Sequence, residues 1–154
     1  MNILELFKPK QKKFFADAEE ERMVQAIRSA EKQTSGEIRL FIESHCRFIN
    51  PMDRALELFA ELEMHKTQDR NGVLLYFAMK DKQLAILGDE GIHQKLGQAF
   101  WNSEVSNIVA KFKQEAFVDG ICGMIKDVGD ALKTNFPYQR DDNNELSDEI
   151  VFGK

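Results

Sequence analysis

A run of nearly apolar residues, Val73-Leu74-Leu75-Tyr76-Phe77-Ala78, constrains the fold of this chain more than any other feature. A strand of this composition is typical of the centre of a sheet that is covered on both faces. The polar stretch Lys80-Asp81-Lys82 follows it and has the length of a hairpin turn, and residues 83–87 fit a returning strand. The run therefore predicts a hairpin in the middle of a layered domain.

One more strand and several amphipathic helices surround this hairpin. Residues 37–44 alternate, with Ile38, Leu40 and Ile42 on one face, which predicts a strand. Helical spacing of apolar residues predicts the helices. The expected N-caps are Asp17, Asn50, Asn102 or Ser103, and Asp119, with a further short helix over Ile92, Leu96 and Phe100. The apolar stripe expected for the second helix consists of Ala55, Leu56, Phe59 and Leu62.

The order of these elements predicts an α/β fold, a three-layer α/β/α sandwich around a small mixed sheet, in the order αβαββααα. The strand-helix-strand unit makes the first two strands parallel through a right-handed crossover. The hairpin makes the third strand antiparallel to the second. We expect a basic N-terminal segment over residues 1–13, one domain over residues 14–137 and an acidic, disordered tail over residues 138–154.

The two ends of the chain carry opposite charge. Residues 1–13 hold four lysines against one glutamate, and this segment fits either contact with an anionic membrane surface or a solvated helix start. The tail ends in the apolar stretch Ile150-Val151-Phe152. That stretch could dock on a partner or fold back on the domain, although an ordinary tail is the simpler expectation.

Composition excludes several functional classes. A net charge of −5 argues against a nucleic-acid partner, because such binding depends on neutralising phosphates. No apolar run is long enough for a transmembrane segment, and the N-terminus does not fit a signal peptide. Cys46 and Cys122 form no metal-binding or redox motif, so we expect reduced thiols in a cytoplasmic protein.

The predicted topology brings acidic residues from three distant segments to one corner of the sheet. The parallel strands begin at the edge where the third strand ends. Oxygen ligands close together suit a hard cation such as Ca²⁺ or Mg²⁺, which would also relieve the repulsion between the carboxylates. The candidate metal ligands are Asp69, Asn71, Asp89, Glu90 and Glu37.

The same residues also fit a purely structural role. Asp69 and Asn71 are ordinary turn residues, and Asp89 or Glu90 could cap the helix that follows. Arg70 could neutralise the carboxylates without any metal. Spacing alone favours this structural interpretation.

Several blocks of the sequence, in their order, resemble the TPM domain family, which includes the thylakoid-lumen acid phosphatase linked to photosystem II repair. These blocks are Gly36-Glu37-Ile38-Arg39-Leu40, Asp69-Arg70-Asn71-Gly72-Val73-Leu74-Leu75, Leu84-Ala85-Ile86-Leu87-Gly88 and Phe117-Val118-Asp119-Gly120-Ile121. The resemblance covers about residues 14–136. It implies an α/β/α sandwich with divalent cations bound by acidic loops. Carried over by position, it favours Asp69, Asn71 and Asp89, with Glu37 and Glu90 as additions.

Two functional hypotheses follow. The first is a divalent-cation-binding accessory or protein-interaction domain, whose partner is another protein. The second is a metal-assisted phosphatase that acts on phosphate monoesters, as the plant relative suggests. A phosphatase also needs a nucleophile or cationic groups for the phosphate, and no spacing singles out Arg70 or Ser35 for that role. We therefore prefer the first hypothesis and assign no catalytic residue.

Overall fold

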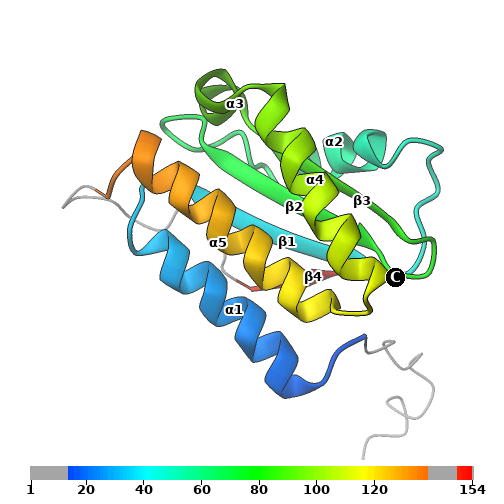
Figure 1. Ribbon diagram of the computed structural model, residues 1–154. Helices are drawn as coiled ribbons and strands as arrows, with labels where there is room; N and C mark the ends of the chain where they lie inside the picture. The colour runs from blue at the N-terminus through cyan, green and yellow to red at the C-terminus, as the bar shows by residue number, and fades with distance from the viewer. Residues whose placement is uncertain (1–13, 139–148, 154) are drawn as a thin grey trace, which may run out of the picture.

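The structure, a computed structural model, describes residues 14–138 and 149–153, and it has the predicted three-layer α/β/α architecture (Figure 1). The sheet order is β3-β2-β1-β4. The strands are β1 (Glu37–Glu43), β2 (Gly72–Ala78), β3 (Gln83–Gly88) and β4 (Val151–Phe152). The helices are α1 (Asp17–Glu31), α2 (Pro51–Glu61), α3 (Glu90–Leu96), α4 (Gln98–Lys113) and α5 (Phe117–Asn135). The predicted order αβαββααα is confirmed, and β4 is added to it.

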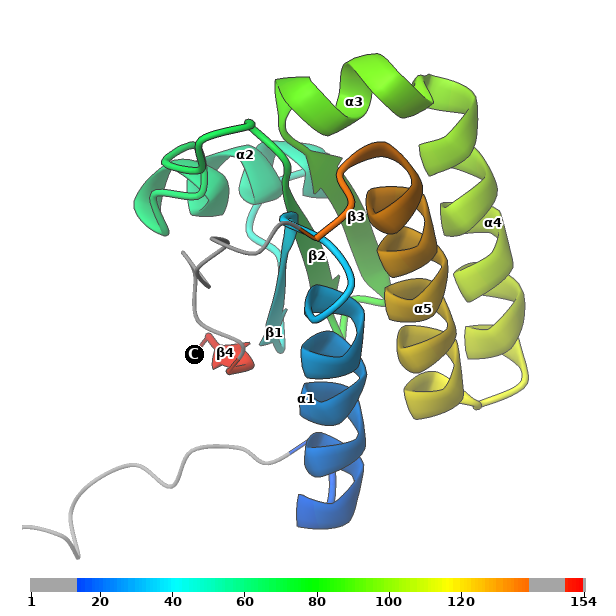
Figure 2. The same cartoon turned by 90° about the vertical axis from the view of Figure 1, so that its left-hand side faces the viewer.

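The predicted strand directions are also confirmed. β1 pairs parallel to β2 from Glu37↔Gly72 to Glu43↔Ala78, and β2 pairs antiparallel to β3. Every residue of β2 is buried, as its apolar run predicts. Helix α2 covers one face of the sheet, and α1, α4 and α5 cover the other (Figure 2). Each face has its own apolar core, because side chains along a strand alternate between the faces.

Some helix ends and faces differ from the prediction. Helix α4 begins at Gln98 rather than after Asn102 or Ser103, because Gly97 turns the chain with a φ of 78° and separates it from α3. Ala16 and Ala116 precede α1 and α5, so Asp17 and Asp119 lie inside the first turn and are not caps. Asn50 does cap α2, with its side chain accepting from the Met52 N–H. Leu56, predicted to face the core, is 52% exposed, and Leu58 is buried there instead.

The C-terminal tail contradicts the prediction of disorder over residues 149–153. Val151 and Phe152 pair parallel to β1 as β4, opposite Phe41 and Ile42. Their side chains pack against the cores on the two faces of the sheet, which gives the apolar stretch a reason to fold back. The expectations for residues 1–13 and 139–148 lie outside the described residues.

A buried carboxyl group lies between α4 and α5. Glu104 is only 6% exposed and hydrogen-bonds the carboxyl group of Asp127 on α5. Its burial, and secondly the negative charge of Asp127, raise the pKa of Glu104 from 4.5 to about 7. Protonation of Glu104 therefore stabilises the contact between these helices.

We predict that Glu104→Gln removes a pH dependence of stability. Because folding raises the pKa of Glu104, the stabilisation is fully present below pH 4.5 and is lost as the pH rises through about 7. Relative to wild type, Glu104→Gln should have little effect at pH 4 and raise the free energy of unfolding by roughly 1–3 kcal/mol at pH 8. Urea unfolding at both pH values measures this difference. Glu61→Gln, at an exposed position of α2, is the control; equal pH profiles for wild type and Glu104→Gln would contradict the prediction.

Candidate functional site

The sheet edge below α3 brings together the three predicted acidic segments. Glu37 begins β1 opposite Gly72, and Gly88 ends β3 opposite Val73, so the starts of the parallel strands and the end of the third strand meet (Figure 1). Two backbone hydrogen bonds join these segments. The Glu37 N–H donates to the Asn71 carbonyl at 3.3 Å, and the Asp89 N–H donates to the Gly72 carbonyl at 2.9 Å. We call residues 69–71, 89–90 and Glu37 the acidic corner.

Arg70 is the counter-ion of this corner. Its Nε and Nη2 donate to the two oxygens of Asp89, at 2.6 and 2.8 Å, and its Nη1 donates to Glu90 at 3.2 Å. Asp89 is 6% exposed, whereas the Arg70 side chain is 41% exposed. The hydrogen bonds to Asp89 raise the pKa of Arg70, so the guanidinium stays charged. The buried carboxylate of Asp89 is therefore paired with a half-exposed cation.

The backbone around this ion pair is closely packed. Asp89 caps α3 by accepting from the Glu90 N–H at 2.8 Å. Arg70 has a φ of 51°, and its carbonyl accepts from the Gly91 N–H at 2.8 Å. A Cβ on Gly91 would lie 2.1 Å from the Asp69 carbonyl oxygen, so only glycine permits this approach. The loop before β2 and the start of α3 thus hold each other in place.

The remaining predicted ligands lie around the ion pair in different environments. Asn71 is buried, and its Nδ2 donates to the Ser35 hydroxyl at 3.2 Å. The Asn71 Oδ1 is also buried and accepts no hydrogen bond within residues 14–138 and 149–153. Glu37 is buried at the start of β1, and Asp69 is exposed. The predicted residues therefore share one edge of the sheet, with Asp89 and Glu90 joined through Arg70.

The corner fits a metal only in part. Its donors are carboxylate and amide oxygens, which suit a hard cation, and the buried Asn71 Oδ1 is an available ligand. In the part of the chain that the structure describes, however, no three His, Cys, Asp or Glu side chains are grouped closely enough to hold a metal ion. Both oxygens of Asp89 are engaged by Arg70. A cation would therefore have to compete with the guanidinium.

A second polar cluster, absent from the sequence prediction, lies near the other end of β1, where that strand finishes at Glu43. Glu43 accepts from Arg54 Nε at 2.9 Å and from the Tyr76 hydroxyl at 2.5 Å. Burial first, and then the bond to Glu43, raise the pKa of Tyr76. Arg54 also binds Glu57, which Arg47 contacts from the surface. The charges in this cluster neutralise one another, so we assign the cluster a role in stability. The only sign of it in the sequence is a glutamate at the end of a strand that is covered on both faces.

His93, His45 and Cys46 are engaged in other contacts. His93 Nδ1 accepts from Trp101 Nε1 at 3.0 Å, so this ring nitrogen is engaged away from the acidic corner. His45 Nδ1 lies 2.9 Å from Asp81, and the Cys46 thiol donates to the Phe48 carbonyl.

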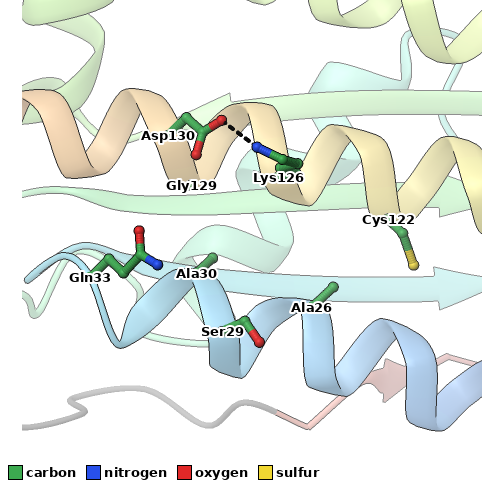
Figure 3. Close-up of a pocket in the computed structure, with 8 residues that line it drawn as sticks. All are labelled: Ala26, Ser29, Ala30, Gln33, Cys122, Lys126, Gly129 and Asp130. Carbon is green, nitrogen blue, oxygen red and sulfur yellow. Dashed lines mark hydrogen bonds and ion pairs between the residues drawn. The ribbon is translucent and has the colours of Figure 1, made fainter.

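A groove of about 370 Å³ between α1 and α5 ends at Cys122 (Figure 3). The small residues Ala26, Ala30 and Gly129 line it, and an ion pair between Lys126 and Asp130 lies beside them. Burial raises the pKa of the Cys122 thiol, which disfavours the nucleophilic thiolate. This groove therefore has no activated nucleophile at Cys122.

The family model of the TPM domain matches residues 9–131. The chain belongs to the TPM domain family. No curated protein matches it at a significant level. This TPM domain is similar to the BA42 protein of the psychrophilic bacterium Bizionia argentinensis, known from an NMR structure, with 41% identity and a TM-score of 0.85. That similarity covers 94% of this chain and 99% of BA42.

Two more distant NMR structures share the fold of this TPM domain. The N-terminal domain of a protein from P. gingivalis is 16% identical, with a TM-score of 0.64, covering 79% of this chain and 78% of that one. The N-terminal domain of the cg2496 protein from Corynebacterium glutamicum is 11% identical, with a TM-score of 0.57, covering 82% and 84%. These likenesses show the fold alone. Within residues 14–138 and 149–153, no helix of the TPM domain has the length and apolar character needed to span a bilayer.

We predict that the acidic corner depends on Arg70 for stability. Arg70→Gln leaves the buried carboxylate of Asp89 without its cation, so the free energy of unfolding should fall by roughly 1–3 kcal/mol. Glu90→Gln is the matched control, because the Glu90 side chain is 64% exposed; its effect should stay within about 0.5 kcal/mol. Urea unfolding at pH 7 and low salt measures both. Equal stability of Arg70→Gln and wild type would show that the pair contributes nothing.

Proposed function

We propose that this TPM domain is a non-catalytic protein-interaction domain whose acidic corner binds a divalent cation in competition with Arg70. The observation that supports it is the pairing of a buried carboxylate, Asp89, with a cationic side chain that is itself half-exposed. A buried carboxylate requires a positive partner. The guanidinium can leave toward solvent, and a hard cation can then take its place.

The oxygens of Asp89, Asn71 and Asp69 would hold this cation, with Glu90 and Glu37 as further donors. The buried Asn71 Oδ1 supports this ligand set, since it accepts no hydrogen bond within the described ranges. Ca²⁺ or Mg²⁺ suits oxygen donors of this kind. When bound, such an ion would neutralise the corner and fix the loop before β2 against α3. Its identity, the partner protein and a cytoplasmic location stay predictions.

The alternative, a metal-assisted phosphatase, has less support. Transfer of a phosphoryl group needs a nucleophile and cationic groups aimed at the phosphate. Arg70 is the cation of this corner, and its guanidinium is directed at Asp89 and Glu90. The Ser35 hydroxyl accepts from Asn71. Both groups are therefore already engaged by protein side chains, so we favour interaction over turnover.

We predict that weakening the internal counter-ion strengthens cation binding. Calorimetric titration of Arg70→Gln with Ca²⁺ and with Mg²⁺ should give a Kd at least roughly tenfold lower than that of wild type, because competition from the guanidinium is lost. The double variant Asp69→Ala with Asp89→Ala should not bind. Saturating cation should also restore the stability that Arg70→Gln loses, since a ligand of the folded state stabilises it.

Two results would contradict this proposal. Binding that survives in the double variant would place the cation elsewhere. Steady hydrolysis of a generic phosphate monoester, abolished by the same double variant, would instead support the phosphatase. A variant with Glu61→Ala, which changes an exposed carboxylate of α2, controls for nonspecific loss of negative charge.

A further inference from the structure

Within residues 14–138 and 149–153, the outer edge of β1 is only partly covered. On its inner side all seven residues of β1 pair with β2. On its outer side β4 pairs with two of them, Phe41 and Ile42 (Figure 2). Nearer the start of β1, the Ile38 N–H donates to the Glu31 side chain at 3.1 Å. This bond occupies one more backbone group on the outer side of the strand. A strand edge of this kind is a template for another extended chain.

The segment that covers this edge fits it by alternation. Ile150 and Phe152 pack against the core on the α1 side of the sheet, and Val151 packs against the core on the α2 side. The Gly153 N–H donates to the Ile42 carbonyl at 2.8 Å. A Cβ on Gly153 would lie 2.8 Å from the Glu43 Cβ and 2.9 Å from Phe41, so the edge requires glycine at this position.

The outer edge of β1 also carries a polar side chain, Arg39, opposite residue 149. Continuing the β1–β4 register places residue 149, a glutamate, opposite Arg39. Arg39 lies on the α2 side of β1, and its Nε is buried with no hydrogen-bond partner in the described part of the chain. An acidic residue opposite Arg39, three apolar residues and a glycine therefore make up the pattern that this edge accepts.

We propose that the outer edge of β1 is a peptide-binding site, occupied here by residues 149–153, which takes an extended segment of a partner protein by parallel strand addition. The segment would carry the pattern acidic–apolar–apolar–apolar–Gly. This inference rests on the protein-interaction part of the proposed function and names the kind of partner. It does not depend on the cation, since the contacts of residues 149–153 with β1 and the acidic corner involve different residues.

The covering strand is suited to displacement. It has two residues, and all its side chains are half-buried. A partner segment that extends toward Glu37 would pair with more of β1 and add main-chain hydrogen bonds that β4 does not make. The tail is connected to the domain through residues 139–148, so it competes with any partner at the high effective concentration of a short connection. A partner segment must therefore bind the edge of β1 tightly enough to displace the connected tail.

The test uses the full chain with Phe152→Asp, which prevents the tail from docking, and a capped synthetic peptide of residues 149–153. Backbone amide shifts followed during titration to millimolar peptide should give a Kd at least roughly tenfold lower for the variant than for wild type. The shifts should map to β1 residues 38–43. Gly153→Val, a second full-chain variant that displaces the tail by steric conflict, should behave in the same way.

Two matched controls accompany this experiment. Ile49→Asp adds the same charge at a fully exposed position, and its affinity for the peptide should equal that of wild type. A peptide with valine in place of Gly153 should not bind to either tail variant. Urea unfolding of each variant verifies that the domain is folded.

Three outcomes would overturn the proposal. The first is the absence of saturable binding to both tail variants, and the second is equal binding of the valine peptide. The third is a wild-type dimer in sedimentation that Phe152→Asp abolishes, because the outer edge of β1 would then take the tail of a second copy rather than a partner protein. Loss of cation binding in Asp69→Ala with Asp89→Ala should leave the peptide affinity unchanged, which separates this inference from the proposal for the acidic corner.

Discussion

The parallel pairing of β1 and β2 is the constraint on which the rest of the structure depends. Because α2 connects them as a crossover, both strands start at the same edge, and the hairpin returns β3 to that edge. The order of the chain therefore decides that acidic residues more than fifty positions apart meet. The same pairing leaves the other side of β1 open to β4, which pairs with Phe41 and Ile42.

In the acidic corner, the residues of the proposed cation site also have a structural role. Asp89 caps α3, accepts from Arg70 and is buried, so the start of α3 depends on a charge that must be neutralised. An arginine already does this without any metal. The proposed cation therefore exchanges for an internal group, and the corner can keep its fold in both states. The proposed binding would therefore be weak and would respond to the cation concentration.

Much of the fold could be predicted from the sequence because its signals are local. The apolar run of β2 and the alternation of β1 identified both central strands, and the topology placed Asp69, Asn71 and Asp89 at one edge. The helix break at Gly97 could not be located, because a glycine between two apolar stripes fits a continuous helix until its positive φ is known. β4 docks because its side chains pack against the apolar cores on both faces of the sheet. A strand of two residues has too short a pattern for the sequence to predict this packing. The choice of Arg70 as counter-ion likewise depends on side-chain geometry.

The exchange between Arg70 and a cation is the central claim, and the side-chain Nε–H resonance of Arg70 reports on it directly. In an NMR titration of the wild-type protein with Ca²⁺, this resonance should shift toward that of a solvent-exposed arginine as the hydrogen bond to Asp89 is lost. The shift should saturate together with the backbone amide shifts of residues 69–71 and 89–91. Saturable Ca²⁺ binding with an unchanged Arg70 resonance would contradict the account.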